Sequence, residues 1–173
     1  MRVLLALTAA ALLAAGSAHA ESVRFPETGD PAFVIQTPDG WTHKPDGDGN
    51  MLLIAGDKTA SYALTIGSYS GTLDALAAGA MKVAGANPPQ QMGPTQISGF
   101  RGYMYDSDMT NAGGVHINVH LVVVKLDTAH MASITRLTID GITAQGYTDA
   151  NSVLANATIT AVPPAPHHKR HRR

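Results

Sequence analysis

Cysteine is absent from the 173 residues of the sequence. The chain therefore has no disulfide, no thiol nucleophile and no cysteine that could be lipidated after export. Its stability must come from a hydrophobic core instead. The length is sufficient for one domain that buries a core of useful size.

Signatures of common enzyme classes are also missing. The sequence has no Gly-x-Ser-x-Gly motif, which would hold a serine nucleophile on a tight strand-to-helix turn. It has no glycine-rich phosphate loop at the start of a helix. Because no paired base and nucleophile can be located, we expect a protein that is not an enzyme. The residues indicate no particular cofactor.

Long hydrophobic runs are confined to the N-terminus. Arg2 precedes an apolar stretch, Val3–Ala15, that is shorter than the roughly 20 residues needed to span a bilayer. Small residues at Ala18 and Ala20 fit the narrow pockets of a signal peptidase. The pattern predicts a cleavable signal peptide over residues 1–20, with a membrane anchor as the alternative. We expect a bacterial periplasmic or secreted protein with no transmembrane segment in the mature chain.

Basic residues are scarce between the two ends of the chain. Five of the 12 lysines and arginines lie in the predicted signal peptide and in the last residues, which leaves seven against all 13 aspartates and glutamates. Nucleic-acid binding requires a basic face, so an acidic body argues against it. We expect a partner protein or a small ligand of the cell envelope instead.

Residues 163–173 differ in composition from the rest of the chain, because prolines are followed by His-His-Lys-Arg-His-Arg-Arg. Prolines exclude regular structure and like charges repel one another, so we predict a disordered tail. Its histidines could bind transition metals weakly, and its cations could make weak contact with an anionic surface. A tail that only aids solubility is equally consistent with this composition.

The segment Val115–Ile139 predicts a central antiparallel hairpin, because two arms rich in β-branched residues flank a short polar connection. Side chains alternate between the faces of a strand, so a one-residue slip would exchange the faces. Placing Lys125 opposite Met131 separates apolar from polar residues. The pairs on the apolar face are Ile117 with Ile139 and Val119 with Leu137. The pairs on the polar face are His116 with Asp140, Asn118 with Thr138, and His120 with Arg136.

A third strand is predicted next to this hairpin, in the extended segment that ends at Met109. Pairing Met109 with Val115 adds tyrosines to the apolar face and carboxylates to the polar face. The pairs are then Tyr105 with Val119, Tyr103 with Leu121, Asp108 with His116, and Asp106 with Asn118.

The remaining pattern predicts an α+β domain over residues 21–162, with an antiparallel sheet of about five to seven strands. Apolar residues at helical spacing predict one helix over residues 73–84, with Thr72 or Ser70 as its cap. A short C-terminal helix is predicted to begin at Thr148. The predicted strands are 33–37, 51–55 and 61–67 in addition to those above. Residues 21–31 are expected to be a loose lead-in.

The Pro38-Asp39-Gly40-Trp41 turn after a short strand, followed by a hairpin, a helix, long antiparallel strands and a closing helix, resembles the family of PsbP and Mog1. The resemblance covers most of Phe33 to Ala157. It implies a non-enzymatic accessory or binding protein, with helices across parts of both sheet faces. No functional residue of that family matches by position.

The predicted polar face gives the candidate site. Its members are Asp106, Asp108, His116, Asn118, His120, Arg136 and Asp140. The simplest interpretation is a solvated sheet face on which opposite charges pair across strands. A divalent metal could be held only by Asp108, His116 and Asp140, because His116 and His120 are about 13 Å apart on one strand.

Two functions follow. The first is a small exported accessory or binding protein that holds a partner or an apolar ligand on one sheet face or in the groove between sheet and helix. The second is metal handling by Asp108, His116 and Asp140 with help from the histidine-rich tail.

Overall fold

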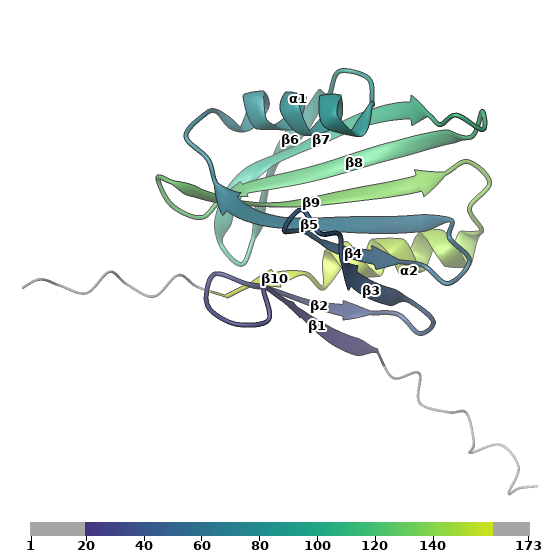
Figure 1. The fold of residues 1–173 in the computed structure, drawn as a ribbon, viewed down its shortest axis with the longest axis horizontal. Helices are drawn as coiled ribbons and strands as arrows, with labels where there is room; N and C mark the ends of the chain where they lie inside the picture. Colours follow the sequence, from purple (N-terminus) through teal and green to yellow (C-terminus); the bar gives the residue numbers. More distant parts are fainter. Residues whose placement is uncertain (1–19, 161–173) are drawn as a thin grey trace, which may run out of the picture.

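The computed structural model describes residues 20–160, which form two antiparallel sheets and two helices (Figure 1). The larger sheet has seven strands in the order β3-β4-β5-β9-β8-β7-β6, and the smaller has the order β1-β2-β10. The elements are β1 (Glu21–Phe25), β2 (Phe33–Thr37), β3 (Thr42–Pro45), β4 (Met51–Ile54), β5 (Ala60–Ser68), α1 (Leu73–Ala84), β6 (Gln90–Ile97), β7 (Phe100–Thr110), β8 (His116–Lys125), β9 (His130–Ile139), α2 (Ala144–Ala155) and β10 (Thr158–Ile159).

The central hairpin has the predicted register. Lys125 lies opposite Met131 and Ile117 lies opposite Ile139, so β8 and β9 separate their side chains into the two expected sets. Helix α1 also has the predicted bounds. The Thr72 side chain accepts a hydrogen bond from the Ala75 amide, and Gly85 ends the helix with a φ of 74° that favours glycine.

The predicted register between β7 and β8 was wrong by two residues. Met109 lies opposite Ile117 rather than Val115, and Asp106 lies opposite His120. The reason is a longer connection, in which the Asn111 side chain accepts hydrogen bonds from the amides of Gly113 and Val115. A shift of two residues keeps every side chain on its predicted face.

Strands β1, β3 and β10 were not predicted. Residues 21–25 form β1 rather than a loose lead-in, β3 pairs with β4, and β10 is only two residues long. The Ser98-Gly99 pair forms a tight turn between β6 and β7, which are two paired strands. The C-terminal helix begins earlier than predicted, because Thr143 rather than Thr148 caps it.

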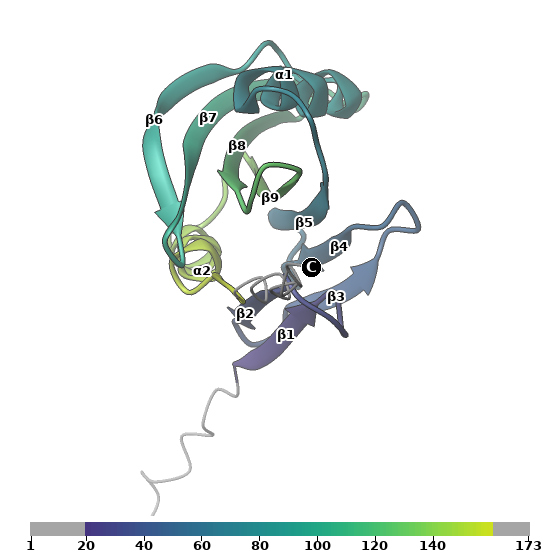
Figure 2. The same cartoon turned by 90° about the vertical axis from the view of Figure 1, so that its left-hand side faces the viewer.

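The seven-stranded sheet packs on both faces (Figure 2). We call the side that carries α1 the α1 face; its buried residues include Met81, Leu121 and Val123. The opposite side, the α2 face, packs against α2 and the small sheet. Its core contains large buried residues of both sheets, among them Phe33 and Leu64. Helices thus cover parts of both faces.

No helix within residues 20–160 combines the length and apolar character needed to cross a membrane. The predicted signal peptide, apart from residue 20, lies outside the described residues, as does the predicted tail at 163–173.

Candidate functional site

The polar end of the α2 face contains a cleft of about 420 Å³ between the sheet and the start of α2. Five of the seven predicted site residues line it: Asp106, Asn118, His120, Arg136 and Asp140. Tyr147 of α2 closes one side. The other two predicted residues, Asp108 and His116, lie next to this group and contact each other.

His116 lies between two carboxylates. Its Nε2 atom is 3.4 Å from an oxygen of Asp108, and its Nδ1 atom is 3.1 Å from an oxygen of Asp140. Asn118 donates a further hydrogen bond of 3.0 Å to Asp140. The predicted row Asp108, His116, Asp140 therefore exists, although Asp108 reaches His116 diagonally and not from the directly opposite position.

The two carboxylates raise the pKa of His116, with Asp140 contributing more than Asp108. Hydrogen bonds from His116 and Asn118 lower the pKa of Asp140. Both shifts favour the charged forms, so the imidazolium and its carboxylates form a surface ion-pair network. The His116 side chain is 41% exposed, and solvent screens these interactions.

The remaining polar groups of the cleft also bind one another. The His120 Nδ1 atom lies 2.5 Å from a carboxylate oxygen of Asp106. Arg136 donates to the Asn151 side chain of α2, and its guanidinium carbon lies 5.6 Å from the centre of the Tyr147 ring. The Arg136 contacts tie α2 to the sheet. The buried Nε atom of Arg136 has no hydrogen-bond partner among the described residues.

The predicted metal ligands do not converge on one point. Each carboxylate faces a different ring nitrogen of His116, so the three groups cannot surround a shared ion in this arrangement. Over residues 20–160, no group of three or more histidine, aspartate or glutamate side chains has the geometry of a metal site. The metal-handling alternative stays a prediction without support from this geometry.

The α1 face has an apolar groove of about 510 Å³ that the residue pattern did not locate. Helix α1 supplies one wall, through Ala75, Leu76, Gly79, Ala80, Met81, Val83 and Ala84. Strands β5, β8 and β9 supply the floor and the other wall, through Ala63, Thr65, Leu121, Met131, Ser133, Thr135 and Leu137. We call this site the α1 groove.

The groove exists because α1 covers only part of its face. The helix contacts β7 and β8, where Ala77 and Met81 are buried, and it leaves β9 and β5 open beside it. Small residues on the open side of the helix leave space above the strands. A Cβ atom added at Gly79 would meet no atom within 4 Å.

The signal for this groove is in the sequence. The apolar positions of the helix predicted over residues 73–84 include Ala80 and Ala84, which line the groove. Alanine and glycine at such positions fill little volume, so part of the sheet opposite them stays uncovered.

No protein-family model and no curated protein matches the chain. Among solved structures, the cyanobacterial PsbP protein of Synechocystis (CyanoP) has a TM-score of 0.58 at 13% identity, covering 84% of this chain and 96% of that chain. LpqN, involved in cell envelope biogenesis of Mycobacterium tuberculosis, has a TM-score of 0.54 at 15% identity, covering 82% and 92%.

A third structure, from Bacteroides thetaiotaomicron, has a TM-score of 0.49 at 15% identity, and the match covers 74% of this chain but only 45% of that one. The first two matches extend over nearly the whole length of both partners and agree with the two helices and antiparallel sheets described above. The chain therefore has a PsbP-like α+β fold.

Proposed function

We propose that this protein is a non-enzymatic binding protein of the cell envelope that holds a small apolar ligand in the α1 groove. The observation that carries the proposal is the groove itself, an apolar cavity of about 510 Å³ on a sheet face that its helix covers incompletely. Ligand sites for small molecules have volumes of about 300–1,000 Å³ and are mostly apolar.

The lining of the groove favours an uncharged, apolar occupant. No lysine, arginine, aspartate or glutamate lines it. Its polar atoms are few, and the Thr65 hydroxyl donates at 2.6 Å to Asn50, which lines the same cavity. Val83 at the rim is 91% exposed, which leaves apolar surface that a ligand would remove from water.

The polar cleft on the α2 face is a weaker candidate. Asp106 and Asp140 already pair with His120 and His116, and Arg136 already contacts α2, so a polar ligand would have to displace these contacts. The α1 groove requires no such exchange.

The envelope location rests on two supports. The predicted signal peptide at residues 1–20 directs export. LpqN, which shares the fold, is involved in cell envelope biogenesis. An accessory role without catalysis agrees with the missing catalytic motifs and with the fold.

Dye binding tests the proposal. We expect the uncharged fluorophore N-phenylnaphthylamine to bind the protein starting at Glu21 with a saturable rise in emission, and decanol to displace it. Gly79→Leu places a side chain in the open space of the groove and should weaken dye binding at least tenfold. Ala78→Leu, on the same helix but outside the groove lining, is the matched control and should bind as the wild type does.

Equal dye affinity in Gly79→Leu and wild type would overturn the small-ligand proposal. If neither dye nor decanol binds, but Gly79→Leu abolishes crosslinking to one envelope protein in intact cells, then the groove is a protein-docking surface instead. The metal alternative has its own test: Zn²⁺ affinity that is unchanged by His116→Ala together with removal of residues 163–173 would exclude it.

A further inference from the structure

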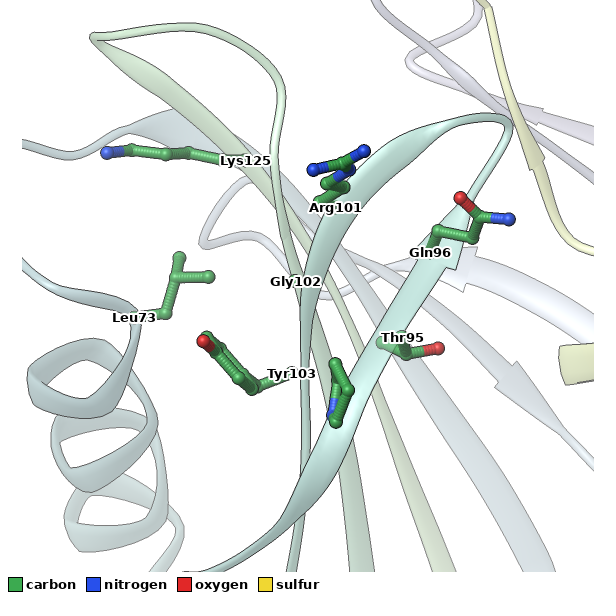
Figure 3. Close-up of a pocket in the computed structure, with 8 residues that line it drawn as sticks. Leu73, Thr95, Gln96, Arg101, Gly102, Tyr103 and Lys125 are labelled. Carbon is green, nitrogen blue, oxygen red and sulfur yellow. The ribbon is translucent and has the colours of Figure 1, made fainter.

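A second cleft, of about 780 Å³, lies beside the start of α1, on the side of β6 and β7. Figure 3 shows Arg101 and Lys125 at its upper rim, with Leu73 of α1 and Tyr103 below them. Gln96 and Thr95 of β6 complete the opposite wall. None of these residues lines the α1 groove.

Strand register explains why these residues lie side by side on the sheet. Gln96 is opposite Arg101, and the pairing of Gly102 with Val124, carried one residue further, sets Arg101 opposite Lys125. Three side chains that can donate hydrogen bonds therefore form one row across β6, β7 and β8. The next row on the same face contains Pro94 and Tyr103.

The two cations of this row have no carboxylate partner in the part of the chain that the structure describes. Within residues 20–160, no ion pair involves Arg101 or Lys125. Like charges directly opposite each other on neighbouring strands destabilise a sheet. Two adjacent cations are unusual in residues 21–160, because acidic residues outnumber basic ones there. An anion placed between the two side chains would remove the repulsion and gain charge-assisted hydrogen bonds.

The lower part of the cleft is apolar and contains an exposed ring. Tyr103 is 39% exposed, and Figure 3 shows its ring pointing towards Leu73. Asp74, which follows Leu73 in the sequence, accepts a hydrogen bond of 2.6 Å from the Tyr105 hydroxyl. An exposed tyrosine next to aliphatic side chains provides a surface on which a flat ring can stack.

We propose that this cleft is a second binding site, for a small organic anion in which a phosphate or carboxylate group is attached to a ring. Arg101, Lys125 and Gln96 bind the charged group, and Tyr103 and Leu73 contact the ring. The site is separate from the α1 groove and does not depend on its ligand.

Amide chemical shifts measured by NMR test this assignment. Phenyl phosphate and benzoate are titrated into the protein starting at Glu21, with inorganic phosphate and benzyl alcohol as probes of the charge and of the ring alone. We expect at least one of the two aryl anions to shift the amides of residues 95–103 and 124–126 saturably. Inorganic phosphate and benzyl alcohol should each bind at least tenfold more weakly than that aryl anion.

The variant Arg101→Gln/Lys125→Gln should lose at least tenfold in affinity for the aryl anion. Lys44→Gln/Lys82→Gln, which removes the same charge outside the cleft, should bind as the wild type does. If the double variant fails to fold, the two single variants provide the same comparison.

Three results would overturn the proposal: no saturable binding of either aryl anion, equal affinity in both double variants, or shifts that map outside the cleft. Inorganic phosphate binding as tightly as phenyl phosphate would overturn the role of the ring.

Discussion

The two faces of the seven-stranded sheet are covered in different ways. On the α2 face, the helix and the small sheet together bury a continuous core, and the polar end is closed by ion pairs and by the Arg136 contacts to α2. On the α1 face, one helix packs over β7 and β8 and leaves the apolar groove beside it.

The difference lies in the side chains of the covering helices. Helix α2 is fixed by specific contacts, among them the hydrogen bond from the buried Tyr62 hydroxyl to the Ala150 carbonyl. Helix α1 is held by the hydrogen bond from the Tyr105 hydroxyl to Asp74 on its covered side, and it presents alanines and a glycine to its open side. Both proposed ligand sites accordingly lie on the α1 face, where side chains of the sheet stay accessible.

The largest expected effect comes from a change in the sheet that both faces share. A Cβ atom at Gly102 would lie 1.8 Å from the Val123 carbonyl oxygen, so Gly102→Ala must push β7 away from β8. We expect a loss of about 4 kcal/mol or more in the free energy of unfolding, measured by urea denaturation. Gly67→Ala, in β5 with no atom within 4 Å of the new Cβ, is the control and should be tolerated.

Core truncation on each face compares the two directly. Leu64 is fully buried on the α2 face and Leu121 is fully buried on the α1 face. We expect Leu64→Ala to cost about 4 kcal/mol and Leu121→Ala about 2–3 kcal/mol, because the site next to the groove can relax or take up water. Equal losses in the free energy of unfolding would show that residues next to the groove relax no more easily than those on the α2 face.

Removing one hydroxyl tests how firmly α2 is held. Burial raises the pKa of Tyr62 to about 12, in spite of nearby Arg136, and the hydroxyl donates to Ala150. Tyr62→Phe removes the hydrogen bond that the Ala150 carbonyl accepts in addition to its helical one, so we expect a loss of about 1 kcal/mol in denaturation experiments. Faster hydrogen exchange should appear in α2 and not in α1, and uniform acceleration would contradict this interpretation.

Gly79→Ala tests the open side of α1. The new methyl group enters free space, and alanine favours a helix over glycine by about 1 kcal/mol. We expect stability to rise by about 0.5–1 kcal/mol with little loss of dye binding. A decrease in stability would indicate that the groove is narrower in solution.

The smallest effect concerns His116 and depends on pH. Because Asp140 and Asp108 raise its pKa in the folded state above the ordinary 6.5, its contribution to stability is complete below 6.5 and disappears as pH rises through the raised value. The difference in stability between wild type and His116→Gln should therefore shrink from pH 6 to pH 9. Titration of the imidazole by NMR gives the folded pKa directly, and an ordinary value would contradict the ion-pair network.

The hairpin and α1 were predictable because their signals are local and redundant. Alternation fixed the pairing of Lys125 with Met131, and Thr72 and Gly85 marked the ends of the helix. The β7 register failed because periodicity of two cannot distinguish registers two residues apart, and the Asn111 turn decides between them.

The α1 groove and the cleft lined by Arg101 and Lys125 were missed for a different reason. Both depend on where a helix lies across strands that are distant in the sequence. For example, Gly79 and Leu137 line one cavity. Periodicity indicates which face a residue occupies, but the extent of coverage follows only from tertiary packing.

Strand β10 also determines when the small sheet can be completed during folding. Thr158 pairs with Val34, and the Ala32 amide donates at 2.8 Å to the Thr160 side chain, 128 residues away. Pairing over such a separation has a high entropic cost and is slow to form. When the chain emerges N-terminus first, one edge of β2 must wait unpaired until the last described residues arrive. A chaperone that shields Phe33 and its neighbours during that interval would then protect this protein from aggregation.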